Sequence, residues 1–209
     1  MSTRFFIARH GETIFNAAAR IQGETPHTPL TRAGFAQADA IGAALRAQLG
    51  ARPDLLLWAS DTGRALQTLA IIAEHLELDP HDSRTDPRLG EIGMGTWGGR
   101  YYRDVIAELG PIHDRASALF TRRAPGGEWF DEIAARLQAW LDEQDRSAAS
   151  TLVITHGVTS RVLRGLLTGA AIRPDCGAPV AQSLPQGSVV EIVDGRENVL
   201  LRGDRVSPP

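Results

Sequence analysis

The sequence has few of the features that mark disulfide-rich, membrane or nucleic-acid-binding proteins. A single cysteine, Cys176, excludes an intramolecular disulfide and any zinc cluster built from several cysteines. Lysine and arginine number 22 against 25 aspartates and glutamates, so no basic excess indicates nucleic acid or an anionic membrane as a partner. No apolar run approaches the about 18 residues of a membrane-spanning helix. We therefore expect a cytoplasmic protein without nucleic-acid or membrane partners.

Apolar residues nevertheless make up 43% of the 209 residues, which is enough to fill a sizeable core. We expect one domain over residues 1–209. Short apolar runs predict strands at 5–8, 55–59, 151–155, 188–193 and 199–201. Amphipathic patterns between them predict helices at 31–49, 62–76, 129–141 and 158–167. This alternation predicts an α/β fold with a largely parallel sheet and helices on both faces.

Two of these helices carry apolar residues at three- and four-residue spacing, which predicts the faces that cover the sheet. The residues are Phe35, Ala38, Ile41, Leu45 and Leu49 in the first helix and Leu66, Leu69, Ile72, Ala73 and Leu76 in the second. Residues 16–27 and 84–100 are rich in turn-forming residues and are predicted to be loops. Residues 101–124 predict one or two short helices, and we expect the segment 98–129 to cover a substrate.

Charged side chains stand where three predicted strands end. Arg9 and His10 close the first strand, Arg64 lies in the helix after the second, and His156 follows the strand at 151–155. The carboxyl ends of parallel strands meet at one edge of a sheet, so we expect these residues to form an anion site. Guanidinium groups donate paired hydrogen bonds to phosphate oxygens, which makes phosphate the favoured anion. His10 taken alone would more simply be a structural histidine.

A neutral histidine at such a site can also act as a nucleophile. His10 could attack phosphorus and hold the phosphoryl group as a phosphohistidine, which divides one difficult displacement into two easier ones. The leaving oxygen needs a proton, and Glu91 is the favoured donor because burial in its glycine-rich stretch could raise its pKa. Glu12 and Glu128 compete for this role. A metal held by His10 and His156 stays open but disfavoured, since the arginines would repel a cation.

No H-E-x-x-H or C-x-x-C motif is present, so we expect neither a metal nor a cofactor. The charged residues instead fall within a set of short motifs in a fixed order. These are Arg9-His10-Gly11-Glu12-Thr13 followed by Asn16; Pro29-Leu30-Thr31 with Gly34 and Gln37; Ser60-Asp61 with Arg64-Ala65 and Gln67-Thr68; Leu89 with Glu91, Gly95 and Trp97; Pro125-Gly126-Gly127-Glu128; and Thr155-His156-Gly157.

In these motifs the chain resembles the histidine phosphatase superfamily, the phosphoglycerate mutase-like proteins, and most closely their broad phosphatase branch. The resemblance implies a three-layer α/β/α sandwich and a phosphorylated His10. It further implies that Arg9, Arg64 and His156 bind the phosphoryl group and that Glu91 donates a proton. It also implies that the pocket is lined by Asn16, Gln22, Gly23 and Gly157.

The sequence departs from the family pattern at three positions. His27 stands where an aspartate is frequent, Gly98 where a glutamate is frequent, and Trp129 where a serine is frequent. None of these positions carries the proposed chemistry, but Gly98 and Trp129 could reshape the pocket. Five apolar residues could favour a substrate with apolar bulk: Phe15, Ile21, Met94, Tyr101 and Trp129.

Three functions remain open on this sequence. We favour a metal-independent hydrolase of a small phosphomonoester. A cofactor-dependent phosphoglycerate mutase-type phosphotransferase is the alternative, because Arg122 and Arg123 resemble a basic pair that binds a second anionic group, although solvated helix-end charges explain them more simply. A non-catalytic phospholigand-binding module is disfavoured by the complete catalytic set. The oligomeric state, monomer or homodimer, is open.

Overall fold

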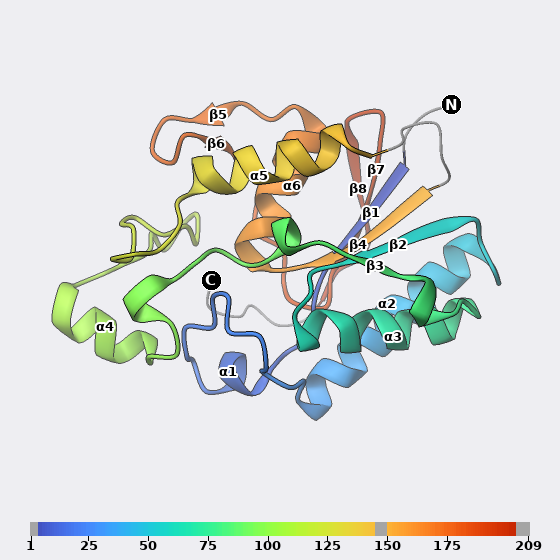
Figure 1. Cartoon of the computed structure of the whole chain (residues 1–209), viewed down its shortest axis with the longest axis horizontal. Coiled ribbons are helices and arrows are strands. Elements are labelled where there is room, and N and C mark those ends of the chain that lie inside the picture. The colour runs from blue at the N-terminus through green and yellow to red at the C-terminus, as the bar shows by residue number, and fades with distance from the viewer. Residues whose placement is uncertain (1–3, 145–149, 204–209) are drawn as a thin grey trace.

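A six-stranded sheet forms the centre of the molecule in the computed structural model, which describes residues 4–144 and 150–203 (Figure 1). Its strands run in the order β3-β2-β4-β1-β7-β8. Four strands are parallel to one another, and β7 pairs antiparallel with both β1 and β8. The strands are β1 (Arg4–Arg9), β2 (Leu55–Ala59), β3 (Arg84–Thr85), β4 (Ser150–Thr155), β7 (Val189–Val193) and β8 (Arg196–Leu201).

Helices cover both faces of this sheet, which confirms the predicted mixed α/β architecture. Alternate residues of β1 point to opposite faces, with Phe6 and Ala8 in one apolar cluster and Phe5 and Ile7 in the other. The first cluster lies under α2 (Arg32–Leu49) and α3 (Gly63–Leu76), which run side by side. The second lies under α5 (Phe130–Asp142) and α6 (Gly157–Thr168) on the other side of the sheet (Figure 1).

The start of α2 fixes the segment that follows β1. The Thr31 hydroxyl caps the helix by accepting a hydrogen bond from Gly34 N at 3.1 Å. Two glycines then allow the backbones to touch, because a Cβ on Gly34 would lie 2.1 Å from Glu12 O and one on Gly11 would lie 2.3 Å from Gly34 O. The first turn of α2 therefore holds the residues after His10 in place.

Several local predictions were wrong. Phe35 is 47% exposed and Leu66 is 37% exposed, so both stand at the outer edge of otherwise buried helix stripes. The predicted loop at 16–27 begins inside the helix α1 (Ile14–Ala17), and the predicted loop at 84–100 contains the strand β3 and two 3-10 helices, η2 (Pro87–Leu89) and η3 (Gly95–Trp97). A third 3-10 helix, η1 (Pro80–Asp82), lies where no element was predicted. Each element is too short to produce a periodic pattern in the sequence.

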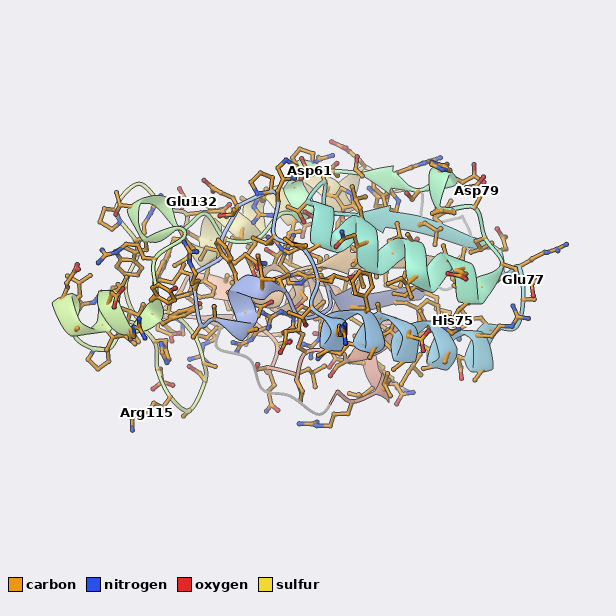
Figure 2. The ribbon with its side chains drawn as sticks, turned by 90° about the horizontal axis from the view of Figure 1, so that it is seen from below. Asp61, His75, Glu77, Asp79, Arg115 and Glu132 are labelled. Carbon is orange, nitrogen blue, oxygen red and sulfur yellow. The ribbon has the colours of Figure 1, made fainter. Side chains whose placement is uncertain are left out.

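The segment 98–129 contains one helix, α4 (Tyr102–Leu109), and otherwise runs as loops. In Figure 1 it lies at the left, on the side of the molecule towards which β1 and β4 run. Arg115, in one of its loops, projects away from the body of the molecule in Figure 2.

A small hairpin, β5 (Ile172–Arg173) and β6 (Ala178–Pro179), contains the buried Cys176 in its turn. Among the helices of the described residues, none has both the length and the apolarity to cross a membrane.

Candidate active site

The charged residues predicted at the strand ends do meet at one edge of the sheet. β1 and β4 are parallel neighbours, with Arg9 in register with Thr155, so the next residues, His10 and His156, emerge together. Their rings are 5.1 Å apart and nearly edge to face. Arg64, in the first turn of α3 after β2, reaches His156. The site is therefore built by parallel pairing of strands that are distant in the sequence.

His10 is held as a neutral imidazole with one nitrogen facing the pocket. Its side chain is 1% exposed, and Nδ1 donates a hydrogen bond to the Gly11 carbonyl at 2.7 Å. Nε2 is then the unprotonated nitrogen, and its single contact is a long 3.4 Å one with Gln22 Nε2. Burial, reinforced by the charges of Arg64 and Arg9, holds the pKa of His10 well below its usual value. The Nε2 lone pair is consequently available near neutral pH.

His156 is the opposite tautomer, with its proton on Nε2 rather than Nδ1. Its Nδ1 accepts a hydrogen bond from Arg64 Nε at 3.3 Å, so Nε2 carries the proton. This Nε2 is buried and has no hydrogen-bond partner among the described residues. Burial is the main reason that the pKa of His156 lies well below its usual value, followed by the charges of Arg64 and His10. An orphaned buried donor costs about 1–3 kcal/mol, which a phosphoryl oxygen placed here would recover.

Arg64 mainly holds a loop rather than presenting free donors. It is fully buried, and its two terminal nitrogens donate to Gly23 O at 2.9 Å and to Thr25 O at 2.6 Å. Nη1 also donates a longer hydrogen bond, of 3.3 Å, to Thr28 Oγ1. Burial lowers its pKa to about 10 although Glu91 opposes this shift. Arg64 thus positions both His156 and the loop over the pocket, and most of its N–H groups are already engaged.

Arg9 offers the free guanidinium of the site. Its side chain donates no hydrogen bond to a described residue, and its Nε is buried without a partner. Burial lowers its pKa, and the carboxylate of Glu91 partly counters this effect. A Cβ built on Gly157 would stand 3.2 Å from Arg9 Cζ and 3.3 Å from Glu91 Oε2. Glycine at this position therefore lets the two charged groups approach the same point.

Glu91 is held by the start of α6. Its carboxylate accepts hydrogen bonds from Val158 N at 3.2 Å and Thr159 N at 3.2 Å, both at the positive end of that helix. The two competing carboxylates lie elsewhere. Glu12 accepts from the Thr31 hydroxyl at 2.7 Å, and Glu128 forms an ion pair with Arg136 at 2.7 Å. Of the three candidates, only Glu91 lines the same cavity as His10.

This cavity, of about 20 Å³, brings together three of the four other predicted pocket residues. Asn16, Gln22 and Gly23 line it, and Thr13 links the first two through its hydroxyl. Gly157, the fourth, instead lines a neighbouring cavity that shares Arg9 with this one. The segment 98–129 contributes Tyr102 and Phe120.

Apolar residues form part of the same wall. Ile21 and Met94 line the cavity as predicted, whereas Phe15, Tyr101 and Trp129 do not. Phe15 instead packs against the Arg20 guanidinium, 4.3 Å from ring centre to Cζ.

The basic pair in this segment does not reach the cavity. Arg123 donates to Gly127 O at 2.7 Å and pairs with Glu132 at 2.9 Å. It lines a separate groove of about 570 Å³ on the other side of Glu91, with carboxylates that include Asp61 and Glu132, both labelled in Figure 2. Arg122 is exposed and makes no ion pair with a described residue.

Several residues of the site were not predicted from the sequence, and three of them hold the proposed nucleophile or proton donor. Thr159 donates its backbone N–H to Glu91, and its place in the first turn of a helix after His156 was the signal that could have shown it. Gln186 Nε2 donates to His10 O at 3.0 Å from a loop far along the chain. Arg136 holds the backbone around Glu91 through Gly90 O at 3.0 Å. Nothing in the local sequence marks the last two.

Within residues 4–144 and 150–203, no group of three or more histidine, cysteine, aspartate or glutamate side chains is arranged to hold a metal ion. The groups that converge on the cavity are instead cationic or neutral donors and one carboxylate. Such a set can bind a phosphoryl oxyanion, attack it with a neutral nitrogen, and transfer a proton to or from an adjacent oxygen.

The comparison with known protein families agrees with this geometry. The model of the histidine phosphatase superfamily (branch 1) matches residues 5–203. The chain belongs to the histidine phosphatase superfamily.

Its relatives in this superfamily carry both mutase and phosphatase names. A curated relative from Yersinia pestis, "Probable phosphoglycerate mutase GpmB", is 33% identical over 171 residues, covering 78% of this chain and 74% of that protein. The mycobacterial glucosyl-3-phosphoglycerate phosphatase has a similar structure, with a TM-score of 0.74, 24% identity and coverage of 98% and 100% of the two chains. TTHB049 of Thermus thermophilus matches with a TM-score of 0.64, 27% identity and coverage of 96% and 98%.

Proposed function

We propose that this histidine phosphatase superfamily member hydrolyses small phosphomonoesters through a phosphohistidine formed at His10, without a metal. The observation that carries the proposal is the neutral His10, which has its unprotonated nitrogen at Nε2 and lines a cavity together with Arg9 and Glu91. Around it stand two buried donors without partners, Arg9 Nε and His156 Nε2. Together they would bind the oxygens of a phosphoryl group during its transfer.

In the first step the His10 Nε2 lone pair attacks phosphorus and the bond to the ester oxygen breaks. Glu91, once it has taken a proton from solvent, gives that proton to the oxygen, so the alcohol leaves neutral. In the second step Glu91 accepts a proton from water as the water oxygen attacks phosphorus. The phosphorus–nitrogen bond then breaks, which returns neutral His10 and releases inorganic phosphate. Arg9 and His156 would hold the phosphoryl oxygens throughout, and Arg64 would orient His156.

Hydrolysis is favoured over phosphoglycerate mutase activity by the position of Arg123. A mutase must retain a bisphosphorylated intermediate, and the pair Arg122 and Arg123 is the site that the sequence offered for its second phosphoryl group. Arg123 is engaged by Gly127 O and Glu132 outside the His10 cavity, and the groove that it lines is rich in carboxylates. We further propose that the segment 98–129 covers the substrate, since Tyr102 and Phe120 close one side of the cavity.

Phosphoenzyme trapping tests the proposal directly. Incubation with a ³²P-labelled phosphomonoester panel and rapid alkaline quenching should give an acid-labile, alkali-stable phosphoprotein in the wild type and none in His10→Ala. A chelator should leave turnover unchanged. A phosphoprotein that persists in His10→Ala would place the nucleophile elsewhere, and ligand affinity without any turnover would indicate a binding module.

A second incubation separates the two enzymatic alternatives. With 3-phosphoglycerate and a trace of 2,3-bisphosphoglycerate, a hydrolase releases inorganic phosphate. Rapid exchange between the phosphoglycerate isomers without phosphate release would instead support the mutase.

A further inference from the structure

A second cavity, of about 40 Å³, lies beside α6 and the loop that precedes β7. Three arginines contribute to its wall: Arg9, Arg161 and Arg164. No carboxylate of a described residue lines it, and serines such as Ser160 and Ser183 add to its polar wall. A water needs roughly 10–15 Å³ measured in this way, so the cavity has room for a small carboxylate or a few waters.

Arg161 gives this cavity an uncompensated positive charge. Its side chain is buried and donates through Nε to Ala181 O at 2.9 Å and through Nη1 to Ala118 O at 3.1 Å. Its Nη2 donates to no described residue, and no described carboxylate forms an ion pair with it. Burial, together with the charges of Arg164 and Arg173, lowers its pKa to about 10. Buried guanidinium groups are normally paired with an anion.

The neighbouring Arg164 shows what a satisfied arginine in this environment looks like. It is equally buried but forms an ion pair with Glu197 at 2.7 Å and donates a further bond to Gln182 O at 3.0 Å. Arg161 is thus the buried arginine of α6 that lacks a counter-charge in the part of the chain that the structure describes.

Arg9 connects this cavity to the reaction site, because it lines both the cavity beside α6 and the one that contains His10. Its unpartnered Nε adds a second donor that no described residue uses. A molecule bound at His10 through its phosphoryl group could therefore extend a second group past Arg9 towards Arg161.

We propose that the cavity between Arg9 and Arg161 binds a carboxylate, either the acid group of a phosphorylated substrate or a small free carboxylate. The substrate form of this inference rests on the proposed hydrolase activity, whereas the free-ligand form does not. Arg161 also holds Ala118 O of the segment 98–129, so an occupied cavity would stabilise that cover over the substrate.

The first experiment compares two substrates that differ at the group in question. 3-Phosphoglycerate carries a carboxylate where glycerol 3-phosphate carries a neutral hydroxymethyl group. Arg161→Met should raise KM for 3-phosphoglycerate about tenfold more than it raises KM for glycerol 3-phosphate, the scale of one charge-assisted hydrogen bond, because the lost bond to Ala118 O affects both esters alike. The matched Arg161→Lys variant keeps the charge and should fall between the wild type and Arg161→Met.

The second experiment needs no turnover. Acetate, exchanged against a bulky sulfonate at constant ionic strength, should raise the Tm of the wild type in a saturable way and leave Arg161→Met unaffected. If Arg161→Met changes only the KM values, the cavity binds the carboxylate of the substrate. If it changes only the Tm response to acetate, the cavity binds a free carboxylate.

If Arg161→Met changes neither selectivity nor the acetate response, the carboxylate site is wrong. If the wild type turns over neither ester, the Tm response to acetate alone tests whether the cavity binds a carboxylate. A lack of any phosphoenzyme would count against the proposed function but would not affect the acetate experiment.

Discussion

Acidification between pH 7 and pH 5.5 should destabilise the fold through the two active-site histidines. His10 and His156 are fully buried, and burial holds the pKa of each well below its usual value. In the unfolded chain each titrates near pH 6.5. The unfolded state therefore binds protons that the folded state does not, and stability that is present above pH 6.5 is lost as the pH falls towards the folded-state pKa values.

The size of this loss follows from the unfolded state alone. At pH 5.5, one unit below the ordinary histidine pKa, protonation stabilises each unfolded imidazole by about 1.4 kcal/mol. At pH 7 this stabilisation is already about 0.2 kcal/mol for each residue, so the two together should lower the free energy of unfolding by about 2.5 kcal/mol relative to pH 7. Urea unfolding followed by tryptophan fluorescence at both pH values measures this difference.

Replacement of the histidines isolates their contribution. His10→Gln and His156→Gln should each reduce the pH-dependent loss by about half, and the double variant should remove this part of it. Leu45→Ala, in the core under α2, is the matched control, since it should lower stability by about 2–5 kcal/mol without changing the pH dependence. A double variant with the wild-type pH dependence would refute the reasoning.

Three further perturbations test the chemistry and geometry of the site. Glu91→Gln keeps the size of the side chain but cannot give up a proton, so kcat should fall by about 10²- to 10⁴-fold while the phosphoryl group still binds, as measured by vanadate inhibition; an unchanged kcat would assign the proton to another group. Gly157→Ala should lower kcat by about tenfold with little change in Tm, because its Cβ would press on Arg9 Cζ at 3.2 Å and Glu91 Oε2 at 3.3 Å; full activity would show that this approach is not required. Arg64→Lys should raise protease cleavage in the loop at residues 23–28, since lysine cannot donate to both Gly23 O and Thr25 O, and cleavage at the wild-type rate would contradict that positioning role.

Parallel pairing explains why the meeting of the proposed catalytic residues could be predicted from the sequence. Arg9, His10 and His156 follow apolar runs of strand length, and the carboxyl ends of parallel strands must lie at one edge of the sheet. The strand pattern therefore carries spatial information over the 146 positions from His10 to His156. The amphipathic stripes of α2 and α3 predicted the covering layer in the same way, apart from Phe35 and Leu66 at the stripe edges.

Residues that act through single long-range contacts could not be predicted. Arg136 reaches Gly90 O and the carboxylate of Glu128, and Gln186 reaches His10 O. Neither contact leaves a periodic pattern, because each depends on how loops close in three dimensions. The contacts of Arg64 could not be predicted either: its place at the strand ends followed from the sequence, but its bonds to the loop at Gly23 and Thr25 depend on how that loop closes.

The arginines near the site differ in their partners, and this difference bears on which phosphate ester the site accepts. Arg64 is engaged by protein oxygens and Arg123 by Glu132, whereas Arg9 has no hydrogen bond to a described residue. Arg9 borders both cavities, so the cation at the phosphoryl group also faces the carboxylate site proposed at Arg161. Binding at Arg161 and phosphoryl transfer at His10 should then be coupled through Arg9. Arg9→Lys, which keeps the charge but loses the planar fork, should weaken both the acetate response and turnover, whereas Arg161→Met should weaken the acetate response far more than the turnover of a substrate without a carboxylate.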